Sequence, residues 1–237
     1  MTDVILYHGL ASTCSKKVRL ALYEKGVAFE SRLLDLRRRE QRDPAYLALN
    51  PDGVVPTLVH KGRAIVESSI ILEYVDDAFD GPELSPADPA GRAAMRLWLR
   101  YSDTAAFPSI TAPTWKFMQG IGPAPGPAGA GQAAAATAAP RYSDADIAAA
   151  ELKMAACISR LEQRLATVDW LLGGNFTLAD AALLPFAHRI RNLRPEFVTA
   201  SGQPAVAAWL ARAAARPSFE RALHFSEDPR AGELPDI

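Results

Sequence analysis

The chain has 237 residues, of which 49% are hydrophobic and 22% charged, and this is enough for one large core or two modest ones. The formal net charge of -1 gives no reason to expect binding to nucleic acid or to an acidic membrane surface. No apolar stretch approaches the roughly 20 residues that span a bilayer, and residues 1–7 lack the pattern of a signal peptide. The two cysteines, Cys14 and Cys157, cannot form a disulfide framework, so we expect a protein of the reducing cytoplasm with no membrane partner.

The first 80 residues alternate strand and helix signals. Short apolar runs predict strands, helical spacing predicts helices, and Lys61-Gly62 is typical of a two-residue hairpin connection. The expected elements are a strand at 4–7, a helix at 15–25 ended by Gly26, a parallel strand at 27–34, a short helix at 44–49, a hairpin of 57–60 with 63–66, and a helix capped by Ser68. This order is that of an α/β thioredoxin-like domain.

The rest of the chain has only helix and loop signals. Residues 81–89 contain three prolines and predict a linker, and residues 90–237 predict an all-α domain. Eighteen of the 22 residues from Gln119 to Pro140 are Ala, Gly or Pro. A stretch of this composition buries little apolar surface, so it is either a surface insertion or a loop that gates a substrate.

Hydroxyl and thiol side chains stand just before the first helix, in the run Ser12-Thr13-Cys14-Ser15. A helix N-terminus presents free N–H groups and the positive end of the helix dipole, so it favours an anion such as a thiolate. Simple capping by Ser12 or Thr13 is the alternative. A reactive Cys14 would instead form mixed disulfides, as in a reductase.

Two further clusters suit an extended peptide ligand. Pro56 has no N–H group and cannot donate a hydrogen bond to a neighbouring strand. A cis Val55–Pro56 bond would turn the backbone of Val55 outward, where it could pair with such a peptide. At the next helix start, Glu67 suits an ammonium group, whereas Ser68 and the helix N-terminus suit a carboxylate. An ordinary trans proline and a simple helix cap remain the alternatives for these two clusters.

Together the three clusters resemble the glutathione transferase superfamily. The run from Ser12 to Leu22 is similar to the zeta-class motif, although Thr13 replaces a serine and no aromatic residue follows Ser15. The resemblance implies a cytosolic detoxification enzyme with glutathione as co-substrate or cofactor. It implies that Ser12 hydrogen-bonds the sulfur. It also implies that the peptide is held by Gln41, Val55, Pro56, Glu67 and Ser68. Arg39 and Arg42 are alternatives to Gln41.

In the helical region, Thr177 and Asp180 match the capping motif of this family and form a capping box. Four side chains are candidates for a pocket that takes a hydrophobic electrophile, each with core packing as the alternative: Tyr101, Trp115, Phe117 and Met118. The resemblance also implies a homodimer. The four histidines show no metal-ligand spacing, so no metal is predicted.

The activity that follows from this resemblance is attack of the glutathione thiolate on an electrophilic small molecule. A glutathione-dependent isomerase, dehalogenase or aryl-ether-cleaving enzyme on the same scaffold is the close alternative. The 119–140 stretch departs from the zeta pattern and weakens an isomerase assignment. A non-catalytic protein that only binds glutathione or another ligand is the alternative of a different class.

Overall fold

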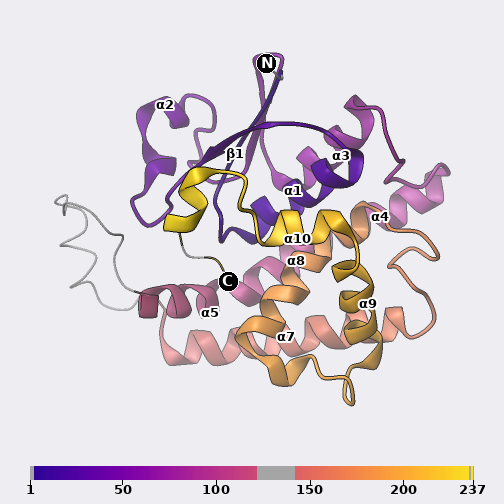
Figure 1. Cartoon of the computed structure of the whole chain (residues 1–237). Coiled ribbons are helices and arrows are strands. Elements are labelled where there is room, and N and C mark those ends of the chain that lie inside the picture. Colours follow the sequence, from indigo (N-terminus) through magenta and orange to yellow (C-terminus); the bar gives the residue numbers. More distant parts are fainter. Residues whose placement is uncertain (1–2, 122–141, 235, 237) are drawn as a thin grey trace.

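The computed structural model describes residues 3–121, 142–234 and 236 (Figure 1). Its N-terminal part is a four-stranded sheet with strand order β2-β1-β3-β4. The strands are β1 (Val4–His8), β2 (Glu30–Leu33), β3 (Thr57–His60) and β4 (Arg63–Ile65), and the helices are α1 (Thr13–Lys25), α2 (Pro44–Leu47) and α3 (Ser68–Ala78). Strands β1 and β2 are parallel, whereas the other two pairings are antiparallel. The thioredoxin-like prediction is confirmed.

The boundaries of these elements follow local chemistry. Gly26 ends α1 with a left-handed φ of 73°, and the turn after it delays the second strand, which begins at residue 30 and not at 27. Lys61 and Gly62 have φ values of 50° and 77°, as a tight hairpin requires. The prediction that Ser68 caps α3 is wrong: Glu67 stands at the cap, and Ser68 is the first helical residue.

The regular elements of the described C-terminal part are helices, and six of them are α-helices. They are α4 (Pro89–Tyr101), α5 (Phe107–Ile121), α7 (Asp144–Leu165), α8 (Leu178–Leu193), α9 (Pro204–Ala214) and α10 (Pro217–Leu223). A π-helical turn, Ser102–Ala106, joins α4 to α5 without a break, so the single helix expected at 93–107 is part of a longer one. The Ala/Gly/Pro stretch contributes residues 119–121 to the end of α5, and its residues 122–140 lie outside the described residues.

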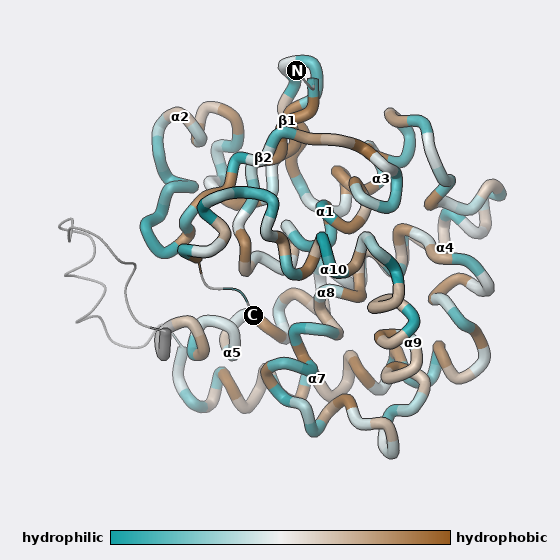
Figure 2. Tube along the Cα trace, in the orientation of Figure 1, coloured by the Kyte–Doolittle hydropathy of each residue, from teal (hydrophilic) through white to brown (hydrophobic). Residues whose placement is uncertain are grey.

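One hydrophobic core runs through both parts of the chain. Helix α1 packs against α3 on one side and against α8 and α10 on the other, so it joins the sheet to the helices (Figure 1). Leu20 of α1 and Leu183 of α8 are both fully buried in this core. Figure 2 shows hydrophobic and hydrophilic residues alternating along α7, as expected of a helix with one buried face.

The buried carboxylate of Asp180 links three segments of the helical part through hydrogen bonds. The backbone N–H of Thr177 donates to Asp180 Oδ2 at 3.0 Å, which confirms the predicted capping box. The Asp180 carboxylate also accepts hydrogen bonds from the Leu171 N–H at 2.9 Å and from the Trp209 indole at 3.0 Å. None of the helices within the described residues is long and apolar enough to cross a membrane.

Candidate functional site

The sheet brings the three predicted clusters to one edge. Tyr7 pairs with Thr57, and Leu58 pairs with Ile65. The C-terminal ends of β1 and β4 and the N-terminal end of β3 therefore lie at the same edge of the sheet. The loop with Ser12 follows β1, Val55-Pro56 precedes β3, and Glu67 follows β4. Segments up to 55 residues apart in the sequence thus lie around one surface.

Ser12 occupies the N-cap of α1. Its hydroxyl oxygen accepts a hydrogen bond from the Ser15 N–H at 3.2 Å, and its side chain is half-buried. A hydroxyl group carries one donor and two acceptor lone pairs, so the Ser12 proton can still be donated to a ligand. The dipole of a 13-residue helix adds partial positive charge at the same place. This combination of a hydroxyl donor and a helix N-terminus suits an anion in front of Ser12.

Cys14 lies two residues further along and points elsewhere. It packs against the main core and contacts the Ser68 side chain. Burial raises the pKa of the Cys14 thiol, and the opposing effect of Lys17 is smaller. A thiol in such surroundings is poorly ionised.

The peptide bond between Val55 and Pro56 is cis, as predicted. The preceding carbonyl, that of Val54, is held by the Tyr46 hydroxyl at 2.5 Å and by the Asn50 amide at 3.0 Å. Both of these side chains also contact Thr57 Oγ1. Within the described residues, the backbone N–H and C=O of Val55 have no hydrogen-bond partner. This short segment is therefore rigid and can pair with an extended peptide.

The start of α3 combines an unusual backbone with a buried cation. Glu67 is exposed and has a φ of 66° and a ψ of 108°, which lie outside the backbone conformations common for residues with a side chain. Ser68 is buried, and the neighbouring Ser69 hydroxyl accepts a hydrogen bond from Lys17 Nζ at 2.9 Å. Lys17 is fully buried and also pairs with Asp103 at 2.9 Å. The charge of Lys17 is thus matched by Asp103, and the free N–H groups and the dipole at the start of α3 are what favour a carboxylate there.

Gln41 lies in the 3-10 turn of Glu40–Arg42, close to the loop before Val55. A Cβ added at Gly53 would meet the Gln41 carbonyl at 2.9 Å and Arg42 Nη1 at 2.8 Å. The Gln41 side-chain oxygen is buried and has no partner among the described residues. The geometry therefore brings both Gln41 and Arg42 to the same end of the surface.

The four predicted pocket residues do not gather in one place. Trp115 and Phe117 lie on α5 with exposed fractions of 42% and 46%, and the half-buried Met118 follows them. Large exposed apolar side chains on one helix suit an apolar ligand. Tyr101, in contrast, lies on α4, with Arg160 at 4.1 Å from its ring centroid and Cys157 as a neighbour.

A buried arginine, which the sequence analysis missed, holds the loop before Ser12. Arg19 on α1 is fully buried and donates to the carbonyls of Gly9 at 3.2 Å, Leu10 at 3.2 Å and Ala222 at 2.8 Å. It also donates to His8 Nδ1 at 2.9 Å. Burial lowers the pKa of Arg19 to about 10, so it stays protonated at neutral pH. Arg19 therefore fixes the loop to both α1 and α10.

A buried histidine makes folding sensitive to pH. His188 on α8 lies near Lys16 and Arg191, and burial, together with these cations, lowers its pKa to about 3. The ordinary pKa is 6.5. Below pH 6.5, His188 therefore binds a proton in the unfolded chain, whereas in the folded protein it binds one only near pH 3. His188 contributes stability above pH 6.5 that is lost progressively as the pH falls.

Between pH 6.5 and 5, His188 is expected to lower the free energy of unfolding by about 2 kcal/mol, since one pKa unit corresponds to about 1.4 kcal/mol. His188→Gln removes this contribution. Urea denaturation at both pH values should show that the wild type loses about 2 kcal/mol more than the variant. An equal loss in both proteins would contradict the assigned pKa shift. The comparison cancels the other titrating groups, because they are common to both proteins.

Comparison with known proteins finds one family for both parts of the chain. A family model described as "Glutathione S-transferase, N-terminal domain" matches residues 6–83, and one described as "Glutathione S-transferase, C-terminal domain" matches residues 132–212. Glutathione S-transferase 3 of Zea mays is 32% identical over 230 residues, which cover 94% of each chain. Protein LigF of Sphingobium sp. strain SYK-6 is 29% identical over 237 residues, which cover 90% of each chain.

Solved structures agree with these matches. The crystal structure of the beta-etherase LigF has a TM-score of 0.80 at 28% identity and covers 95% of this chain and 100% of that one. A theta-class glutathione S-transferase of Xanthomonas axonopodis pv. citri, solved with glutathione bound, has a TM-score of 0.77 at 26% identity. It covers 96% of this chain and 100% of that one.

Proposed function

Since the chain belongs to the glutathione S-transferase family and uses glutathione as its co-substrate, we propose that Ser12 activates the thiol for attack on an electrophile. The observation that carries this proposal is the Ser12 hydroxyl, which is held at the N-terminus of α1 with its proton free to donate. A free thiol has a pKa near 8.5, and lowering it by about two units corresponds to roughly 2.7 kcal/mol. The thiol proton leaves to solvent, the sulfur forms a bond to carbon, and the leaving group departs with its electron pair.

The peptide part of glutathione is placed by the other clusters. Val55 pairs with its backbone through one N–H and one C=O, neither of which has a hydrogen-bond partner within the described residues. Glu67 binds the ammonium group of the γ-glutamyl end, and Ser68 with the start of α3 binds its carboxylate. Gln41 and Arg42 lie next to the carboxylate at the glycine end of glutathione.

Glu67→Ala is expected to weaken glutathione binding by roughly 1.5–3 kcal/mol, because a hydrogen bond to a charged group is lost. Calorimetry with glutathione measures the change. Glu83→Ala is a matched control, since Glu83 is an exposed acid in the segment that follows α3. Equal affinities of the wild type and Glu67→Ala would remove Glu67 from the site.

Ether cleavage is a second candidate activity, and one observation favours it. LigF, which is similar to this chain in both sequence and structure, is named a beta-etherase. In such a reaction the thiolate attacks the carbon that bears an aryloxy group, the C–O bond breaks, and the phenolate takes up a proton. Release of 4-nitrophenolate from 2-(4-nitrophenoxy)acetophenone in the presence of glutathione tests this activity. Turnover of aryl halides without release of phenolate would leave conjugation as the function.

We further propose a homodimer that acts in the cytoplasm. Ile70 on α3 and Leu97 on α4 have exposed fractions of 59% and 65%. Ile70 lines a hollow of about 500 Å³ together with Ser69, Glu73 and Arg96, and Leu97 follows Arg96 on α4. Exposed apolar side chains on neighbouring helices suit a two-fold interface, and free Cys14 and Cys157 suit a reducing compartment.

Light scattering at micromolar concentration is expected to give twice the chain mass of 25.5 kDa. Leu97→Glu should shift the protein towards the monomer, because it places a charge in the apolar contact. Leu152→Glu is the matched control, since Leu152 is 76% exposed on α7, away from α3 and α4. A wild type that scatters as a monomer would contradict the dimer.

A further inference from the structure

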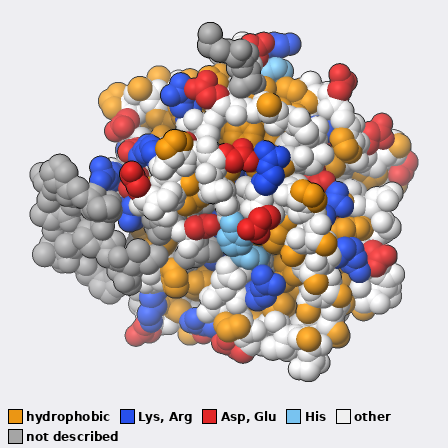
Figure 3. All heavy atoms as spheres, viewed as in Figure 1, with side chains coloured by type: hydrophobic (Ala, Val, Ile, Leu, Met, Phe, Trp, Pro, Cys, Tyr) orange, Lys and Arg blue, Asp and Glu red, His pale blue; other side chains and the backbone are white. Residues whose placement is uncertain are grey.

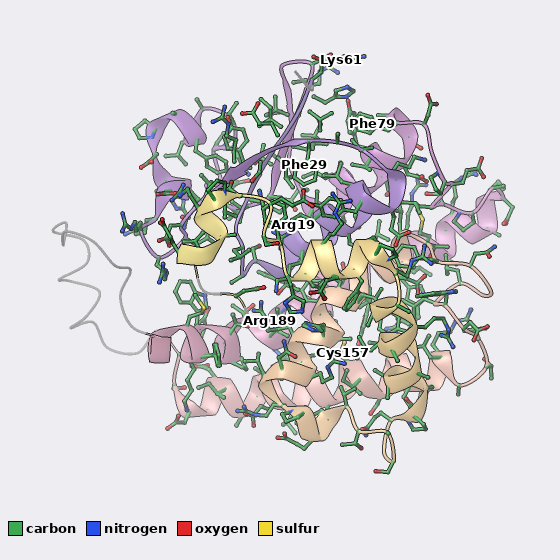
Figure 4. The ribbon with its side chains drawn as sticks, viewed as in Figure 1. Arg19, Phe29, Lys61, Phe79, Cys157 and Arg189 are labelled. Atoms are coloured by element: carbon green, nitrogen blue, oxygen red, sulfur yellow. The ribbon has the colours of Figure 1, made fainter. Side chains whose placement is uncertain are left out.

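The segment that follows α10 packs against the sheet and reaches the loop between β2 and α2 (Figure 1). Phe225 stacks on Phe29 with 6.4 Å between the ring centroids, and the Arg19 guanidinium lies 5.3 Å from the centroid of the Phe225 ring. Figure 4 shows Arg19 and Phe29 beside this segment. Further along, the Asp228 carboxylate accepts a hydrogen bond from the Ser31 hydroxyl at 2.7 Å. The segment is therefore fixed to the sheet before it reaches the loop.

Arg230 in this segment joins the end of β2 to the turn before α2. Its Nη1 donates to the Leu33 carbonyl at 2.7 Å, and its Nη2 donates to both carboxylate oxygens of Glu40, at 2.8 and 3.0 Å. Glu40 Oε2 also accepts the Asp35 N–H at 2.8 Å. Figure 3 shows basic and acidic side chains next to each other on this side of the molecule. The carboxylate of Glu40 is thus held by the C-terminal segment and by its own loop.

The two residues after Glu40 are those that we assign to the glycine end of glutathione. Gln41 Oε1 is buried and has no partner among the described residues. Arg42 is exposed, and its guanidinium makes no ion pair or hydrogen bond within the part of the chain that the structure describes. It lies against the turn at Gly53, where an added Cβ would meet Arg42 Nη1 at 2.8 Å. A free cation beside an unsatisfied amide oxygen suits the carboxylate and the N–H of a terminal glycine.

An unpaired acid at Glu40 would interfere with such a site. Glu40 and Arg42 are the two ends of one 3-10 turn, so a free carboxylate at Glu40 would compete for the Arg42 charge and repel the glycine carboxylate. Arg230 prevents this competition because its planar guanidinium engages both oxygens of the acid. Arg230 lies 190 residues further along the chain than Glu40. The C-terminal segment therefore controls the charge next to the glycine end.

We propose that Arg230 is a positioning residue for the glycine end of glutathione: by binding both oxygens of Glu40, it keeps Arg42 free for the terminal carboxylate. The inference rests on the proposed function and adds a preference for the tripeptide with a charged C-terminus. Loss of Arg230 should weaken the binding of ligands that carry this carboxylate and leave the binding of other ligands unchanged. Removal of the Glu40 charge should reverse the loss.

Calorimetry with glutathione and with its C-terminal amide tests this role, because the two ligands differ only in the charge at the glycine. The wild type should bind glutathione at least about 10-fold more tightly than the amide, since a hydrogen bond between charged groups is at stake. Arg230→Met should bring this ratio close to one, while the unchanged affinity for the amide shows that the variant is folded. Arg221→Met is the matched control, because Arg221 lies on α10 and pairs with the exposed Glu227 at 2.8 Å, and it should keep the ratio.

The double variant Arg230→Met/Glu40→Gln separates this role from a purely structural one. A glutamine at position 40 still accepts the Asp35 N–H but carries no charge, so most of the ratio should return. Arg230→Lys, which keeps the positive charge, should retain most of the ratio as well.

An unchanged ratio in Arg230→Met, an equal loss for both ligands, or no recovery in the double variant would overturn the role of Arg230. A wild-type ratio near one would also overturn it. The ratio is measured without turnover, so it decides the role of Arg230 even if Ser12 does not activate the thiol. Failure of the wild type to bind either ligand would contradict the proposed function as well.

Discussion

Ser12→Ala is expected to lower the rate of glutathione conjugation by about 100-fold, or roughly 2.7 kcal/mol of lost stabilisation. The hydroxyl is the group at the start of α1 whose proton is available to a sulfur anion, since its oxygen already accepts the Ser15 N–H. Steady-state turnover of an aryl halide measures the loss. The affinity for glutathione should change far less, because the peptide is held by other residues.

Cys14→Ala is the matched control for this substitution. The thiol packs against the core, and burial raises its pKa, so turnover should stay within a few-fold of the wild type while stability falls slightly. If Cys14→Ala abolished turnover and Ser12→Ala did not, the serine would not be the activating group. A glutathione adduct on Cys14 in mass spectra would then indicate a thiol-disulfide exchange enzyme.

Arg19→Met is expected to lower the free energy of unfolding by about 3–5 kcal/mol. Methionine fills much of the volume but leaves the carbonyls of Leu10 and Ala222 without a buried donor, whereas the Gly9 carbonyl keeps the Ser12 N–H at 3.3 Å. Each of these orphaned acceptors costs about 1–3 kcal/mol, and the loss of a desolvated charge offsets part of the total. Urea denaturation measures the change.

The exposed Lys116 provides the control, because it pairs with Asp144 at the surface and Lys116→Met should cost less than about 1 kcal/mol. Activity distinguishes a local role of Arg19 from a global one. If Arg19→Met is folded at low temperature, it should still show reduced turnover, since the loop before Ser12 loses its anchor. A free energy of unfolding within 1 kcal/mol of the wild type would contradict the role of Arg19.

The fold and the edge with Ser12 could be predicted because their signals are local. The glycine at 26, the Lys61-Gly62 pair and the Val55-Pro56 dipeptide each constrain the backbone through their own chemistry. The capping box at Thr177 likewise needs only a neighbour three residues away. In such cases the residue type and its nearest partners determine the structure.

The charged core of α1 could not be predicted in the same way. Lys16, Lys17 and Arg19 have the composition of a solvated helix face, yet all three are buried. Their partners Asp236 and Asp103 lie 220 and 86 residues away in the sequence. Nothing in the local sequence indicates that α8, α10 and residues near the C-terminus cover this helix. Buried charges of this kind become visible only when tertiary contacts are known.

The pKa of glutathione bound to the enzyme tests the central claim most directly. Ultraviolet difference spectroscopy follows the thiolate as the pH is raised, without a second substrate. For the wild type, the account predicts a pKa about two units below the value near 8.5 of the free thiol, and for Ser12→Ala a value close to that of the free thiol. The same pKa in both proteins would contradict activation of the thiol by Ser12.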